Sequence, residues 1–133
     1  GDDVEIKVFF VNPKIANGND CDTGEFVTRK IPKTTKVADA ALRQLFAGPT
    51  DAEKQKGMEG IASLGSYYIG VTIKNGKAIV NFKPGAEKYL YVDGPFCMQS
   101  GVLTPISKTL TQFSSVKDVD FAINGKIIED WDA

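Results

Sequence analysis

The stretch Ala41-Leu42-Arg43-Gln44-Leu45-Phe46-Ala47-Gly48-Pro49-Thr50 decides the fold. Its apolar residues recur at the spacing of one helical face, and Gly48-Pro49 is a typical helix stop. Thr34 or Thr35 is available upstream as the N-cap. We therefore predict an amphipathic helix here, with its apolar side packed in the core.

Two further helices are expected. Thr50 followed by Glu53 has the spacing of a capping box, which predicts a short helix from Asp51 to about Gly57. The other helix ends near Phe113, and Pro105 implies either a kink in it or a start with Thr104 as N-cap. Its apolar face is formed by Val102, Leu103, Ile106, Leu110 and Phe113.

Strands are predicted on both sides of these helices. Asn75-Gly76 is a strong hairpin signal between two β-rich segments, because a type I′ turn needs positive φ at both central residues. Alternation places Ile69, Val71 and Ile73 on one face. Residues 84–96 read as an irregular excursion. The expected strands are Val4 to Val11, Phe26 to Ile31, Tyr68 to Lys74, Lys77 to Phe82, Val119 to Ile123, and Ile127-Ile128.

The order of these elements predicts an α+β fold. Two amphipathic helices separated by a hairpin bury their apolar faces against a sheet, so we expect a two-layer sandwich with both main helices on one face of a small mixed β-sheet. The chain of 133 residues is expected to be one domain over residues 1–133. Its core is expected at about 5–127, with residues 1–3 and 130–133 as tails.

Composition argues against several classes of partner. The net charge is −1, and the 16 cationic residues include only Arg29 and Arg43 as arginines, so nucleic acid is not expected as a partner. The apolar runs are only a few residues long, so any membrane attachment is expected through an anchor that precedes Gly1. Positive charge is concentrated locally at Arg29, Lys30, Lys33 and Lys36. We interpret these residues as a solvated surface, and the alternative is a patch that binds anionic ligands.

Cys21 and Cys97 are the only cysteines, and the chain has no histidine. Two cysteines alone do not make a zinc site. They are either two free thiols or a disulfide, whose loop of about 75 residues the chain-entropy model values at roughly 4 kcal/mol. A disulfide would place the domain outside the cytoplasm.

No catalytic equipment is evident. Without histidine the chain cannot form a Ser-His-Asp or Cys-His arrangement. Ser114 and Lys117 have the bare Ser-x-x-Lys spacing but lack the accompanying motifs. Asp20 and Asp22 do not fit the calcium loop of an EF-hand. We expect no enzyme activity, no cofactor and no metal.

Three stretches together resemble the GerMN family of sporulation and spore germination proteins. They are the 41–50 stretch, the Asn75-Gly76 hairpin, and residues 109–125. Glu53 and Gly57 match the acidic residue and the glycine that follow the Gly-Pro-Thr stop. Arg29 and Pro32 match a strand that precedes the helix. The resemblance covers roughly residues 5–127, and the family's best-known sporulation member carries two copies of the domain where this chain has one.

The resemblance implies a compact α+β domain of secreted, lipid-anchored or membrane-tethered bacterial proteins, without established catalytic residues. The function we expect is a noncatalytic extracytoplasmic assembly or scaffolding domain of the cell envelope, which contacts an envelope protein or a second copy of itself. The alternative is a module that binds a small molecule or a wall polymer such as peptidoglycan. Its stacking platforms would come from Tyr67, Tyr68, Tyr89, Tyr91 or Trp131.

Overall fold

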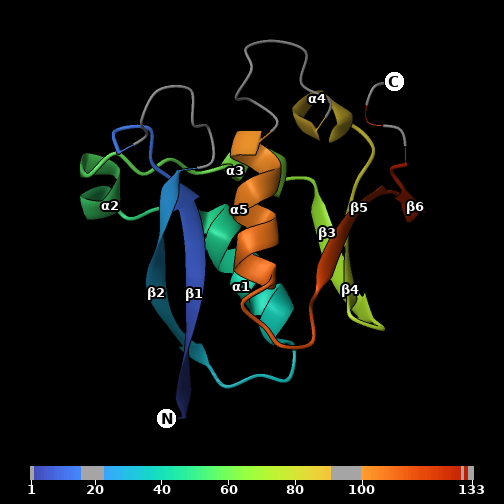
Figure 1. The fold of residues 1–133 in the computed structure, drawn as a ribbon, viewed down its shortest axis with the longest axis horizontal. Helices are drawn as coiled ribbons and strands as arrows, with labels where there is room; N and C mark the ends of the chain where they lie inside the picture. The colour runs from blue at the N-terminus through green and yellow to red at the C-terminus, as the bar shows by residue number, and fades with distance from the viewer. Residues whose placement is uncertain (1, 16–22, 91–99, 130, 132–133) are drawn as a thin grey trace.

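The computed structural model describes residues 2–15, 23–90, 100–129 and 131 (Figure 1). Within these residues the chain forms six strands and five helices. The strands are β1 (Asp3–Val11), β2 (Gly24–Pro32), β3 (Tyr68–Lys74), β4 (Lys77–Phe82), β5 (Asp118–Ile123) and β6 (Lys126–Ile127). The helices are α1 (Val37–Ala47), α2 (Asp51–Gln55), α3 (Ala62–Gly65), α4 (Glu87–Leu90) and α5 (Ser100–Leu110).

The strands form two separate sheets. Sheet A is the antiparallel hairpin of β1 and β2, in which Val8 lies opposite Val27. Sheet B has the order β3-β4-β5-β6, and its only parallel pair among the described strands is β4 with β5. The α+β class is confirmed, but the single mixed sheet that we expected is divided into two.

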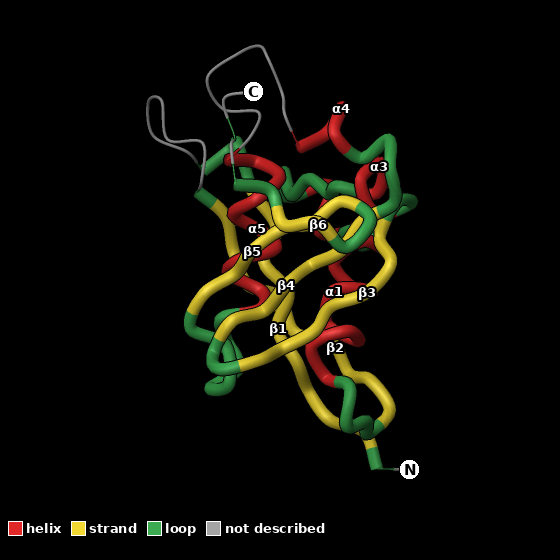
Figure 2. The backbone as a smooth tube through the Cα atoms, turned by 90° about the vertical axis from the view of Figure 1, so that its right-hand side faces the viewer, coloured by secondary structure: helices red, strands yellow, loops and turns green. Residues whose placement is uncertain are grey.

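The two main helices lie between the sheets. Figure 1 shows α1 and α5 between the long hairpin and sheet B, and Figure 2 shows sheet B in front of both helices. One core joins all of these elements, because side chains from both sheets and both helices bury one another there. Its fully buried members include Val8, Phe10, Leu42, Leu45, Val80, Phe82, Ile106 and Leu110.

Local signals place the ends of the first two helices well. Gly48 follows α1 with φ 89°, a conformation that L side chains rarely adopt, and α2 begins with the predicted capping box of Thr50 and Glu53. The predicted threonine N-cap of α1 is wrong. Lys36 occupies that position without a side-chain cap, because the Thr34 hydroxyl instead accepts a hydrogen bond from the Lys36 N–H (3.0 Å) in a local turn.

The start at Thr104 is also wrong, because α5 begins at Ser100 and contains Pro105. Proline costs one hydrogen bond within a helix. Ile106 and Leu110 are both fully buried, so the core contacts of this helix offset that loss. The expected irregular excursion after Pro84 begins with α4, whose Leu90 is fully buried.

A bulge changes the expected faces of β3. The register with β4 shifts between Tyr68 and Gly70, so Ile69 leaves the face shared by Val71 and Ile73. Tyr68 takes the core position instead, with its ring centroid 5.1 Å from that of Phe46.

Side chains of α5 and the turn after it cover the second edge of β1. The Gln112 side chain accepts from the Lys7 N–H (2.9 Å) and donates to the Lys7 carbonyl (2.6 Å), as a neighbouring strand would. The fully buried Thr109 hydroxyl accepts from the Phe9 N–H (3.0 Å). This cover satisfies the backbone of β1 and keeps sheet A apart from sheet B.

We predict that Thr109→Val destabilises the fold by about 1–3 kcal/mol, because it leaves the Phe9 N–H buried without an acceptor. Thr111→Val is the matched control, since the exposed Thr111 hydroxyl, just after α5, donates only to the Ser107 carbonyl in the last turn of that helix. Urea unfolding followed by circular dichroism measures both variants. Equal stability of the two would contradict this role for Thr109.

Candidate functional site

The first polar cluster joins sheet A to α2. Arg29 lies on the inner face of β2, and its guanidinium donates to both carboxylate oxygens of Glu53, at 2.6 and 2.8 Å. Each of the two side chains is only 16% exposed. The guanidinium also lies over the Phe10 ring, 5.7 Å from the centroid. This geometry is the bidentate form in which an arginine binds a carboxylate most strongly.

Glu53 has a second role as the cap of α2. Its Oε1 accepts from the Thr50 N–H (2.9 Å), and the Thr50 hydroxyl accepts from the Glu53 N–H (3.2 Å). The hydrogen bonds from Arg29, together with those from Thr50, lower the pKa of Glu53 to about 2, against the opposing effect of burial. Glu53 is therefore a charged structural group, unsuited to proton transfer near neutral pH.

A buried asparagine fixes the far end of the same helix. Asn12 is 1% exposed and donates from Nδ2 to the Lys56 carbonyl (3.1 Å) and to Glu25 (3.0 Å). Gly57 follows with φ 106°, and a Cβ there would lie 2.4 Å from Asn12 Oδ1. Arg29, Glu53 and Gly57, which match the family pattern, thus lie in one cluster with Thr50 and Asn12. We call these five residues the α2 clamp.

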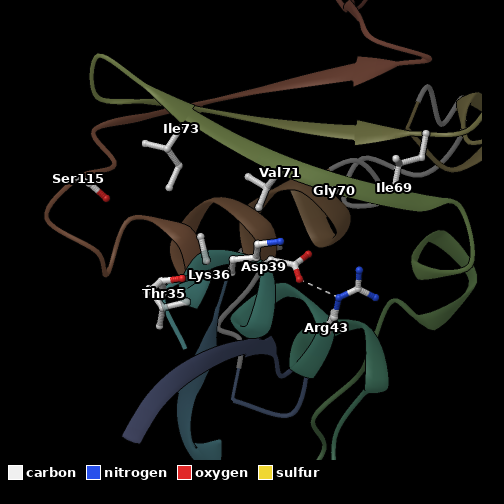
Figure 3. A pocket seen from close by; sticks show the side chains of 11 residues that line it. Thr35, Lys36, Asp39, Arg43, Ile69, Gly70, Val71, Ile73 and Ser115 are labelled. Atoms are coloured by element: carbon white, nitrogen blue, oxygen red, sulfur yellow. Dashed lines mark hydrogen bonds and ion pairs between the residues drawn. The ribbon is translucent and has the colours of Figure 1, made fainter. Parts of the chain in front are cut away.

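A groove lies between the beginning of α1 and the free edge of β3 (Figure 3). We call it the α1–β3 groove. Its volume is about 500 Å³, and Figure 3 shows Val71 and Ile73 pointing from β3 toward α1 while Ile69 points away. The other side of the groove is formed by Thr35, Lys36, Val37, Ala38, Asp39, Arg43 and Ser115.

One ion pair fixes the end of this groove. The Tyr68 hydroxyl donates to Asp39 (2.6 Å), and Arg43 Nε donates to the other Asp39 oxygen (2.9 Å). Burial raises the pKa of Tyr68, and its bond to Asp39 raises it further. Burial opposes ionisation of Asp39, but hydrogen bonds from Tyr68 and Arg43 leave its pKa lower than usual. Near neutral pH Asp39 is therefore charged and Tyr68 is neutral, and the hydrogen bond between them holds the end of the groove together.

A second hollow lies on the outer face of sheet B, with a volume of about 400 Å³. Thr72, Ile79 and Ala122 belong to three adjacent strands, and the bulged Ile69 borders them on the β3 side. Ile69 is 44% exposed and Ile127, on β6, is 37% exposed. The hollow is lined mainly by apolar side chains, and no described element covers this face of sheet B (Figure 2).

The predicted anionic-ligand patch is dispersed. Arg29 contacts Glu53, whereas Lys30 is exposed on β2. Lys33 and Lys36 do come together, in a hollow that Arg43 also lines. Cys21 and Cys97 lie outside the described residues, so their disulfide stays a prediction.

Sequence reasoning named Arg29 and Glu53 but not their contact. The sequence does contain a signal for this contact, because Arg29 alternates with Val27 and Ile31 along the strand and therefore shares their buried face. A cation on a buried face requires a carboxylate nearby. The Asp39–Arg43 pair has the i, i+4 spacing of a helical ion pair, but its contact with Tyr68 depends on the bulge in β3.

These observations define a small α+β domain with a hairpin, two central helices, a four-stranded mixed sheet and a clamped short helix. A family model for sporulation and spore germination, Germane, matches residues 7–129, and the chain belongs to this family. The resemblance to GerMN domains is thereby confirmed. A comparison with curated protein sequences gives no match.

Several solved structures share the fold. The tandem GerMN domains of the sporulation protein GerM from Bacillus subtilis align with a TM-score of 0.65 and 20% identity over 98% of this chain, which spans only 42% of that chain. The first GerMN domain of GerM gives 0.60 and 20% identity over 98% of this chain and 90% of that one. A putative lipoprotein from Clostridium perfringens gives 0.54 and 17% identity, over 97% and 80%.

The α2 clamp predicts an acid-sensitive fold. Glu53 has a pKa of about 2 in the folded chain and an ordinary one near 4.5 when unfolded, so protons bind preferentially to the unfolded chain. The stabilisation, on the order of 2 kcal/mol, is fully present above about pH 5 and is lost as the pH falls toward 2. Urea unfolding of the protein and of Glu53→Gln across this range measures it. The variant should lose this part of the pH dependence, and parallel profiles would contradict the assignment.

Proposed function

We propose that this chain is a noncatalytic, extracytoplasmic assembly domain of the bacterial cell envelope, which presents sheet B to a partner subunit. The carrying observation is the exposure of sheet B. Two of the five exposed large hydrophobic side chains of the described residues, Ile69 and Ile127, border the hollow on its outer face, and a third, Ile73, lies at its β3 edge. Apolar side chains gathered around an exposed hollow are typical of protein interaction sites.

The polar groups support the noncatalytic part of the proposal. The α2 clamp uses the carboxylate oxygens of Glu53 for Arg29 and Thr50, and Asp39 is bound by Arg43 and Tyr68. Within the described residues no three acidic or cysteine side chains lie together as a metal site would need. The family is one of sporulation and spore germination proteins.

The extracytoplasmic part rests on the family and on the similar structures. They include a sporulation protein and a putative lipoprotein. No helix in the described part of the chain is long and apolar enough to cross a bilayer.

The aromatic residues favour assembly over polymer binding. Tyr67, Tyr68, Tyr89 and Trp131 are partly buried against the core. Tyr67 packs on Tyr89 with ring centroids 5.8 Å apart, and Phe121 packs on Trp131 at the same separation. Rings used in this way add to packing and leave less of their faces for a sugar.

Site-specific photo-crosslinking in cells of the native host tests the proposal. A benzophenone side chain at Ile127 or at Thr72 should give a discrete adduct, either with an envelope protein or with a second copy. Phe26 is the matched control, because it is 47% exposed but lies on sheet A. Absence of a discrete adduct at both sheet B positions, or the same adduct from Phe26, would contradict the proposal.

A further inference from the structure

The free edge of β3 carries unpaired backbone groups. Lys74 and Lys77 flank the two-residue turn at Asn75 and Gly76, so they form a hydrogen-bonded pair of the antiparallel ladder. Because such pairs alternate, the N–H and C=O groups of Val71 and Ile73 point away from β4. β3 ends the strand order of sheet B, so no described strand pairs with these groups.

The two free edges of sheet A are protected in full or in part. The second edge of β1 is covered by Thr109 and Gln112. On β2 the Thr28 carbonyl accepts from Arg29 Nη1 (3.4 Å), and the strand ends at Pro32, which has no N–H. Natural proteins usually protect open edges in such ways. From Val71 to Ile73, β3 has no proline, and no side chain of the described residues is hydrogen-bonded to its backbone.

The α1–β3 groove runs along this open edge. Ile73 is 39% exposed, although its partner Ala78 on β4 is fully buried. The groove therefore exposes the inner apolar side of the sheet where the sheet stops. A further strand beside β3 would cover Ile73 with its inward side chains and would satisfy the Val71 and Ile73 backbone groups.

The lysines beside the groove indicate which charge the partner segment carries. Lys36 lines the groove, and Lys33 lies with it in the adjoining hollow. The carboxylate of Asp39 is already bound by Arg43 and Tyr68, so it does not neutralise either lysine by direct contact. An acidic residue on the incoming strand complements these lysines.

We propose that β3 pairs with an extended segment of a partner protein, which alternates apolar residues and carries a carboxylate opposite Lys36. This inference rests on the proposed assembly function and names the kind of partner segment. Main-chain hydrogen bonds to Val71 and Ile73 provide affinity, and the α1–β3 groove and Lys36 provide selectivity.

We test this binding with a phage-displayed library of random linear peptides. The peptides are about ten residues long, which is the upper length of an ordinary strand. We expect selected sequences to alternate apolar residues and to carry Asp or Glu. Hydrogen exchange measured by NMR should show the Val71 and Ile73 amides protected by a selected peptide.

Ile73→Pro removes an outward N–H and leaves the ladder with β4 intact, so it should weaken peptide binding by about tenfold or more. Ile73→Val keeps the N–H and is the matched control. Lys36→Glu, a second variant outside the strand, should weaken binding several-fold at low salt and less at high salt. Retained exchange protection at β4 confirms that each variant is folded.

The inference is overturned if no sequence is enriched, if peptides bind Ile73→Pro as well as the parent, or if other amides are protected. Crosslinks from Ile127 that persist in that case leave the assembly function standing and remove only strand pairing at β3. Loss of both results removes both proposals.

Discussion

The placement of α2 depends on the ion pair between Arg29 and Glu53, because it joins to sheet A a helix that has no buried side chain of its own. Sheet A provides the guanidinium, and α2 provides a carboxylate that already caps its own helix. The helix is too short to be stable alone, so its position comes from this pair and from Asn12. α1 directly precedes α2, and the buried packing of its Ala41 on Ile6 and Ile31 holds it on the same sheet.

The position of α1 also determines the α1–β3 groove. The length and direction of α1 place Lys36 and Asp39 beside the free edge of β3. Tyr68, the first residue of β3, donates a hydrogen bond to Asp39. In sheet A, the Arg29 side chain and backbone groups of β1 are bound by residues of α2, of α5 and of the turn after α5. Sheet B leaves the apolar hollow on its outer face and the edge of β3 open. The edges of sheet A are therefore largely satisfied by contacts within the molecule, whereas sheet B has an open edge, which we propose pairs with a partner.

Local features were predictable from the sequence because their causes are local. The capping box at Thr50, the turn at Asn75-Gly76 and the stop at Gly48 depend on a few adjacent residues, and each is found. The division into two sheets was not predictable in this way, because it depends on contacts of α5 with β1 about a hundred residues away in sequence. The bulge at Tyr68 is another such case, since the packing of Tyr68 on Phe46 and Phe82 decides it.

A double-mutant cycle on Arg29→Met and Glu53→Gln tests the central claim most directly, with unfolding free energies measured in urea at neutral pH. Gln keeps much of the capping box, so the cycle isolates the ion pair from the cap. We expect a coupling energy of about 2 kcal/mol or more, because the pair is bidentate and each side chain is only 16% exposed. A coupling below about 0.5 kcal/mol, the range of exposed salt bridges, would contradict it.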